Sequence, residues 1–180
     1  HITVVFSGHG GTGRISKRTL LVINENERVS VGEIIRFVFS PRLSIIADSC
    51  RSYIDDEWSG FGDLESVDGS IHFPSYLTLQ KARRIFDYSL RKTPAGVQIL
   101  YSCRTGENSV ITSTGSHYSQ SLLLSIKRWS LKIEDKSILL VQGAHNLSTK
   151  FIKKFNKIQN PRTFRLNDVN YPFAIRLGSE

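Results

Sequence analysis

The 180-residue chain is poor in cysteine and contains no long apolar segment. Its two cysteines, Cys50 and Cys103, do not form the Cys-x-x-Cys pair that is typical of structural zinc sites. A chain of this length with so few cysteines does not depend on a disulfide. We therefore expect two free thiols, a reducing compartment and a cytoplasmic protein. No apolar run approaches the roughly 20 residues that a membrane-spanning helix needs, so we expect no membrane partner.

Motifs that would define several other enzyme classes are also absent. The segment Gly8-His9-Gly10-Gly11 follows an apolar run, as the oxyanion loop of an α/β-hydrolase does. Those enzymes need a Gly-x-Ser-x-Gly nucleophile elbow, and the chain contains no such pentapeptide. It also has no Gly-Lys-Ser or Gly-Lys-Thr, and no Gly-x-Gly-x-x-Gly segment that opens a helix. The sequence therefore argues against a serine hydrolase of that fold, a P-loop enzyme and a dinucleotide-binding domain.

The composition is that of an ordinary globular domain. With 39% hydrophobic and 22% charged residues, the chain is neither disordered nor membrane-bound, and its length suits a single domain over residues 1–180. Because His1 opens almost directly onto an apolar run, we expect a preceding segment to be missing and the chain to be part of a larger protein.

The net charge of +8 could favour an anionic partner. Many of the basic residues fall in two groups, which are Arg83, Arg84, Arg91 and Lys92, and Lys150, Lys153, Lys154 and Lys157. The second group has the spacing of one exposed helix face. Basic groups of this kind are weak evidence of nucleic-acid binding, so we interpret them as solvated surfaces and expect no direct nucleic-acid ligand.

Apolar periodicity predicts alternating strands and helices. Strands are expected at residues 2–6, 19–24, 43–47, 97–101, 137–141 and 171–175, and helices at about 30–39, 76–91, 117–129 and 147–158. Ser30 and Glu33 form a capping box at the start of the first helix, and Pro41 ends it. Residues 52–70 are acidic, rich in glycine and predicted to be a long surface loop. This alternation predicts an α/β fold with a mainly parallel sheet.

A histidine and a cysteine directly follow two of these strands. Residues 2–6 and 43–47 are β-branched apolar runs that predict buried strands, and they are followed by His9 and Cys50. Open α/β sheets hold their ligands at such strand ends. Because an imidazole is the usual activator of a thiol nucleophile, the pair suggests a cysteine protease. The flanking glycines would leave the Gly10 amide free to form an oxyanion hole with the Cys50 amide. The alternative is a loop histidine and a buried cysteine without a catalytic role.

These two motifs resemble the catalytic blocks of caspase-like peptidases, most closely the metacaspases and their bacterial relatives. The matching segments are residues 7–10 and 48–50, in that order. Residues 101–109, 115–119, 160–162 and 171–173 are similar to later blocks of the same family, so the resemblance spans nearly the whole chain. It implies a caspase–haemoglobinase-like three-layer fold, in which helices flank a mainly parallel central sheet.

The resemblance also implies a cysteine endopeptidase with a His/Cys dyad. Cys50 would be the nucleophile, His9 the general base, and the amides of Gly10 and Cys50 the oxyanion hole. The expected partners are a protein or peptide substrate and a regulatory domain or partner protein. The alternative is an inactive caspase-like adaptor, which retention of both His9 and Cys50 disfavours.

Substrate choice is predicted from charge. Animal caspases have Gln two residues before the cysteine and cleave after Asp, whereas this chain has Asp48 at that place. A carboxylate in the S1 pocket would pair with a basic P1 side chain, and best with Arg. We therefore predict cleavage after Arg or Lys. Asp48 could instead cap a loop or a helix N-terminus. Glu107 is a second S1 candidate, or it orders the loop after Cys103.

No cofactor is expected to be required. The carboxylates of Asp55, Asp56 and Glu57 could bind Ca²⁺, which prefers oxygen ligands. The spacing is not that of an EF-hand loop, so a solvated acidic loop is the simpler interpretation.

Overall fold

The structure is a computed structural model that describes residues 1–55, 76–112, 115–131, 137–155 and 158–177. Its centre is a four-stranded sheet in the order β1-β5-β7-β11. These strands are β1 (Ile2–Ser7), β5 (Arg42–Asp48), β7 (Gly96–Tyr101) and β11 (Arg162–Arg165). β1, β5 and β7 are parallel, and β11 runs antiparallel to β7. The predicted α/β class with a mainly parallel sheet is therefore confirmed.

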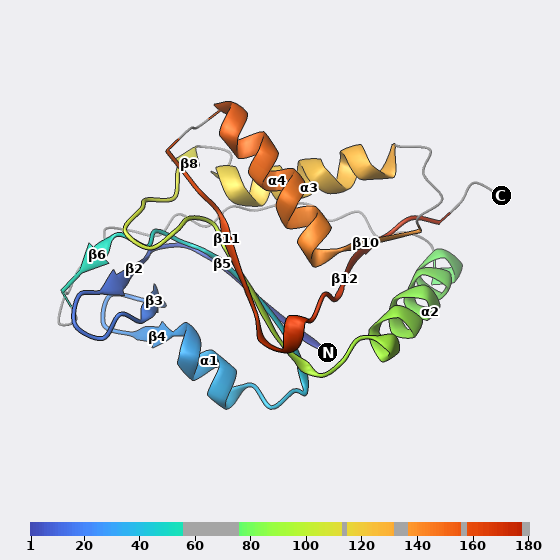
Figure 1. Cartoon of the computed structure of the whole chain (residues 1–180), viewed down its shortest axis with the longest axis horizontal. Helices are drawn as coiled ribbons and strands as arrows, with labels where there is room; N and C mark the ends of the chain where they lie inside the picture. Colours follow the sequence, from blue (N-terminus) through green and yellow to red (C-terminus); the bar gives the residue numbers. More distant parts are fainter. Residues whose placement is uncertain (56–75, 113–114, 132–136, 156–157, 178–180) are drawn as a thin grey trace.

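Helices cover both faces of this sheet (Figure 1). The helices that cover it are α1 (Val31–Phe37) on one face and α3 (His117–Ser130) and α4 (Val141–Phe155) on the other. Alternate side chains of β5 supply the two cores, as the strand period of two requires. Leu43, Ile45 and Ala47 pack with Val31 of α1 in one cluster, whereas Ile46 packs with residues of α3 and α4 in the other.

A second small sheet carries the glycine-rich segment that follows β1. Its strand order is β4-β3-β2-β6, with β2 (Gly10–Gly13), β3 (Thr19–Val22), β4 (Arg28–Ser30) and β6 (Tyr53–Ile54). β2 is antiparallel to β3 and parallel to β6. The glycines after His9 therefore continue as a strand.

The remaining elements belong to neither of these two sheets. They are α2 (Tyr76–Lys92), β8 (Ile111–Thr112), β9 (Gly115–Ser116), β10 (Ile138–Leu140), the short 3₁₀ helix Leu166–Asp168 and β12 (Pro172–Ile175). β10 and β12 form an antiparallel pair, as do β8 and β9. None of the helices in the described ranges combines the length and apolarity needed to cross a bilayer.

The capping residues in the sequence predicted the start of α1 correctly. Ser30 accepts a hydrogen bond from the Glu33 amide at 3.1 Å, and the Glu33 carboxylate accepts one from the Ser30 amide at 2.7 Å. The predicted capping box is thus formed, and these bonds, with Ser30 contributing most, lower the pKa of Glu33. The helix ends at Phe37, slightly before the predicted end.

Three of the predicted features are corrected by the structure. β1 is not buried: it lies at the edge of the sheet with Val5 63% exposed, because among the described residues only β5 pairs with it. α4 begins at Val141, not near residue 147. The predicted loop over 52–70 starts instead with strand β6, and its residues from 56 onward lie outside the described ranges.

Candidate active site

The register of the two sheets brings His9 level with Cys50. Ser7 at the end of β1 lies opposite Asp48 at the end of β5, and Thr12 of β2 lies opposite Tyr53 of β6. The two residues of each pair are the same number of positions apart in the sequence, and His9 and Cys50 are that number of positions apart as well. The segment after β1 and the segment after β5 therefore pass from the central sheet into the small sheet with one common register. His9 and Cys50 occupy the matching positions between the two sheets, and both are half-buried.

Backbone hydrogen bonds hold the two segments together on either side of this position. The Gly8 amide donates to the Asp48 carbonyl at 3.1 Å, and the Thr12 amide donates to the Ser52 carbonyl at 2.8 Å. On its other edge, the segment accepts a bond from the Val22 amide at the His9 carbonyl, at 3.0 Å. Backbone amides alternate in direction along a strand. The Gly10 amide therefore points to the same side as those of Gly8 and Thr12, toward the segment that carries Cys50.

Gly10 is confined by its neighbours. A Cβ atom at this position would lie 2.7 Å from both the Leu20 carbonyl oxygen and Ser49 Oγ. Any side chain here would have to push the Cys50 segment away from β2, because backbone and a buried serine leave no space. The residue beside His9 thus packs directly against the residue beside Cys50. This contact requires glycine at position 10.

The two cysteines lie in different environments. Cys50 is half-buried, and its thiol donates to the Ser109 carbonyl at 3.7 Å. Cys103 is fully buried, with its sulfur 3.3 Å from the Glu107 carbonyl and 3.5 Å from that of Ser49. Burial raises the pKa of the Cys103 thiol to about 11, so it stays protonated at neutral pH. Both thiols are free, as predicted, and Cys103 has the features of an inert core residue.

We expect iodoacetamide to alkylate Cys50 at neutral pH and to leave Cys103 unmodified in the folded protein. The thiolate is the reactive form, and Cys103 is both protonated and inaccessible. Peptide mass spectrometry after timed alkylation measures the two sites separately. A denatured sample is the control and should be modified at both sites. Equal modification rates in the folded protein would contradict the assigned environments.

Asp48 is buried beneath the same site. It is 2% exposed and accepts four hydrogen bonds, from Ser109 Oγ, Ser116 Oγ, the Ser119 amide and Ser119 Oγ. Ser116 is the N-cap of α3, so a negative charge here favours the positive end of the helix dipole. Asp48 thus caps a helix N-terminus, which is the alternative that the sequence left open. Its place in an S1 pocket stays a prediction.

Among the residues that the structure describes, three of the four bonds reach Asp48 Oδ2, and one, from Ser109 at 3.3 Å, reaches Oδ1. A carboxylate oxygen can accept two hydrogen bonds, so Oδ1 retains acceptor capacity. Ser109 also accepts the bond from the Cys50 thiol through its carbonyl. The oxygen of Asp48 that can accept a further hydrogen bond is therefore Oδ1, which contacts Ser109, the residue that Cys50 also contacts.

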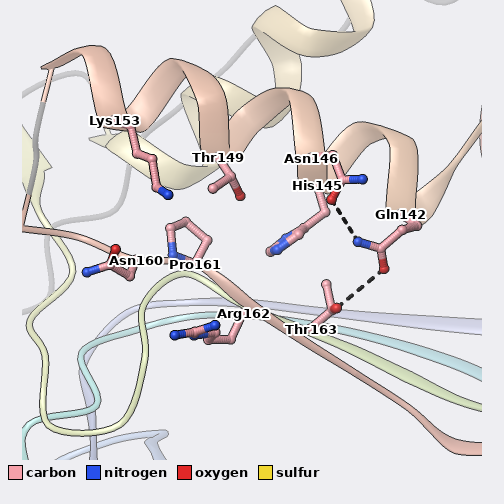
Figure 2. Close-up of a pocket in the computed structure, with 9 residues that line it drawn as sticks. All are labelled: Gln142, His145, Asn146, Thr149, Lys153, Asn160, Pro161, Arg162 and Thr163. Carbon is pink, nitrogen blue, oxygen red and sulfur yellow. Dashed lines mark hydrogen bonds between the residues drawn. The ribbon is translucent and has the colours of Figure 1, made fainter.

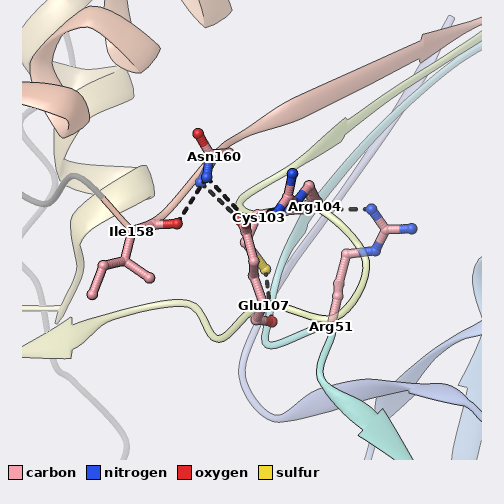
Figure 3. Close-up of polar contacts among 6 residues, drawn as sticks. All are labelled: Arg51, Cys103, Arg104, Glu107, Ile158 and Asn160. Carbon is pink, nitrogen blue, oxygen red and sulfur yellow. Dashed lines mark hydrogen bonds and ion pairs between the residues drawn. The ribbon is translucent and has the colours of Figure 1, made fainter.

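Glu107 orders the loop after Cys103 (Figure 3). Its carboxylate accepts bonds from the Asn160 side chain at 2.8 Å and the Asn160 amide at 3.0 Å, and it forms an ion pair with Arg104 at 2.8 Å. Burial alone would raise the pKa of Glu107, but the bonds from Asn160 and Arg104 outweigh it and lower that pKa. These contacts correspond to the second role predicted for Glu107, the ordering of the loop.

Arg51 is a residue at this site that the sequence did not single out. Its amide donates to the Glu107 carbonyl at 2.9 Å, and its carbonyl accepts from the Gly106 amide at 2.8 Å. Its guanidinium donates to the Cys103 carbonyl at 3.3 Å and lies 3.9 Å from the centre of the Tyr101 ring. Arg51 thus fastens the residue after Cys50 to the 103–107 loop. In the sequence, only its position directly after Cys50 indicates that Arg51 belongs to the site.

Within the ranges that the structure describes, no cluster of three or more His, Cys, Asp or Glu side chains could hold a metal ion. Of the candidate calcium ligands, Asp55 forms an exposed ion pair with Arg14 at 3.2 Å, and Asp56 and Glu57 lie outside the described residues.

Comparison of the chain with models of known protein families and with curated proteins finds no match. What the chain does must therefore be inferred from its own residues.

Proposed function

We propose that this chain is a cysteine endopeptidase with a caspase–haemoglobinase-like three-layer fold, in which Cys50 is the nucleophile and His9 the general base. The observation that carries the proposal is the common register of the two sheets, which sets His9 and Cys50 level at adjacent parallel strand ends. The layer arrangement is compatible with that fold, because helices flank both faces of a mainly parallel sheet. Two free thiols suit the reducing cytoplasm, which we propose as its location.

The proposed reaction proceeds through a thioester. His9 takes the proton of the Cys50 thiol, and the thiolate attacks the scissile carbonyl carbon. The amides of Gly10 and Cys50 stabilise the oxyanion, and each such donor is worth roughly 3 kcal/mol in comparable sites. When the tetrahedral intermediate collapses, His9 gives its proton to the leaving amine and the acyl group stays on Cys50. Water, deprotonated by His9, then releases the carboxylic acid and restores the thiol.

We further propose that Asp48 selects a basic P1 side chain through Oδ1. A substrate acylated on Cys50 would approach Asp48 from the side of Ser109, where the carboxylate has unused acceptor capacity. A guanidinium offers several N–H donors and a positive charge, so Arg should be preferred to Lys, and Asp should be excluded by charge repulsion.

Fluorogenic peptides that differ only at P1 test both parts of the proposal. We expect cleavage after Arg and Lys and none after Asp, together with a covalent adduct on Cys50 from an electrophilic Arg-derived peptide inhibitor. Cleavage after Asp in preference to Arg would refute the proposed role of Asp48 in substrate choice, while the proposed peptidase activity would still hold. If neither cleavage nor adduct forms, with Ca²⁺ present or absent, the chain is an inactive adaptor.

A further inference from the structure

The loop that follows β7 holds the candidate nucleophile at two points. Ser102 Oγ donates to the Ser49 carbonyl at 2.9 Å and accepts from the Ser49 amide at 3.2 Å. Further along the loop, the Ser109 carbonyl accepts from the Cys50 thiol at 3.7 Å. The position of the thiol therefore depends on where this loop places Ser102 and Ser109.

Gln159 binds the loop at both of these points. It lies just before β11, and its side chain is fully buried. Gln159 Nε2 donates to the Ser102 carbonyl at 2.9 Å and to Ser109 Oγ at 3.4 Å, and Oε1 accepts from the Val110 amide at 3.2 Å. Both hydrogens of the side-chain amide and its oxygen are thus used.

The partners of Gln159 allow its side-chain amide only one orientation. The Ser102 carbonyl can only accept a hydrogen bond and the Val110 amide can only donate one, so an exchange of Nε2 and Oε1 would break both bonds. Because Nε2 donates to Ser109 Oγ, the hydrogen of the Ser109 hydroxyl is left for Asp48 Oδ1, at 3.3 Å. Ser109 is therefore held from two sides.

The next residue, Asn160, binds the same loop. Its backbone and side-chain amides donate to the Glu107 carboxylate at 3.0 and 2.8 Å (Figure 3). The Glu107 carbonyl in turn accepts from the amide of Arg51, the residue after Cys50, at 2.9 Å. On the side that faces α4, Asn160 and Pro161 border a pocket of about 320 Å³ (Figure 2). Asn160 is thus joined to the site by hydrogen bonds and is not closely packed on α4.

We propose that Gln159 is a positioning residue of the candidate active site, which holds Ser109 so that the Cys50 thiol stays in place for attack. This inference rests on the proposed peptidase function. The side chain of Gln159 is fully buried, so it acts on Cys50 through Ser109 and not by touching the substrate. A small displacement of a reacting group lowers the rate of the chemical step even where the fold and substrate binding persist.

Gln159→Met tests this role, because methionine has a similar volume and lacks the amide group that makes the bonds to the loop. We expect kcat for a fluorogenic peptide with Arg at P1 to fall at least about tenfold per folded molecule. KM should change less than about twofold, since Asp48 keeps its bonds through Oδ2. Iodoacetamide should alkylate Cys50 at least about threefold faster, because the Ser109 carbonyl no longer holds the thiol.

Gln98→Met is the matched control. Gln98 is also buried, and its side-chain amide also binds a serine hydroxyl, that of Ser44 at 2.8 Å, and a backbone amide, that of Tyr171 at 3.3 Å. It lies near the start of β7, at the end of the strand away from Cys50. We expect this variant to lose stability as Gln159→Met does, but to retain kcat and the Cys50 alkylation rate within about twofold. Urea denaturation gives the folded fraction of each variant under the assay conditions.

Alkylation separates the role of Gln159 from the proposed function. If the unsubstituted chain cleaves no peptide, the proposed peptidase function fails, and the Cys50 alkylation rates of the two variants alone decide whether Gln159 positions the thiol. Equal Cys50 alkylation rates and equal kcat in Gln159→Met and Gln98→Met would show that Gln159 only stabilises the fold. If a methionine variant does not fold, Gln159→Asn and Gln98→Asn, which only shorten the side chain, give the same comparison.

Discussion

Replacing Cys50 by alanine is expected to lower kcat/KM for an Arg peptide by at least about ten-thousandfold. The variant removes the atom that forms the thioester, and no second thiol can substitute for it, because Cys103 is fully buried and protonated. His9→Ala should lower kcat/KM by a similar factor, since the thiol then loses its base and the leaving amine its proton donor. The double variant should be little worse than either single one, because the two residues act as a unit.

The matched control is Cys103→Ala. It removes a thiol of the same type from the end of the neighbouring strand β7, so a general effect of losing a cysteine would appear in both variants. We expect Cys103→Ala to retain activity within about threefold after correction for the folded fraction, since it creates only a small cavity. Initial rates with the P1-Arg peptide are measured for the unsubstituted protein and the four variants. Activity that survives in Cys50→Ala would exclude Cys50 as the nucleophile.

Elements with a complete local signal were predictable from the sequence. β5 is a continuous apolar run that ends in Asp48, and both its burial and its position are as expected. α1 has its own capping box. The positions of His9 and Cys50 could also be predicted. Each residue directly follows a strand, so both lie at one edge of the sheet.

The elements that were missed depend on partners distant in sequence. β2 consists of glycine and threonine, so it has no side-chain pattern, and its extended form comes from pairing with β3 and β6. The N-terminus of α4 has no local cap: its first amides donate to the Tyr171 carbonyl and to Asn170 Oδ1. Apolar periodicity alone therefore placed its start too late.

The hydrogen bonds of Asp48 could not be predicted for the same reason. Its donors are serines more than sixty residues away in the sequence, and they meet it only when α3 packs on the sheet. The residue was identified from its place before Cys50, while its structural role became visible only in the folded chain.

Asp48→Ala is expected to lower the free energy of unfolding at pH 7 by about 3 kcal/mol or more. The change removes four hydrogen bonds to a buried charged acceptor and the negative charge at the N-terminus of α3. Asp48→Asn should also destabilise, because it removes the negative charge at the N-terminus of α3 and its amide oxygen is a weaker acceptor for the serine donors. Urea denaturation followed by circular dichroism gives both values.

Asp55→Ala is the matched control for Asp48→Ala. Asp55 is also an aspartate in a polar contact, but its ion pair with Arg14 is exposed, so we expect a change within about 0.5 kcal/mol. If Asp48→Ala destabilises the protein no more than this control, Asp48 does not cap α3 in solution.

Ser119→Ala separates the structural role of Asp48 from the proposed role in substrate choice. It removes one of the two hydroxyl donors to Oδ2 and leaves the carboxylate group and the contact of Oδ1 in place. We expect a loss of roughly 1–2 kcal/mol in stability and an unchanged preference for Arg over Asp at P1. Asp48→Asn, assayed at a temperature where it is still folded, should lose that preference, because an uncharged amide no longer attracts a guanidinium. If Asp48→Asn keeps the preference for Arg, its only role is at the helix, and another group must select the P1 side chain.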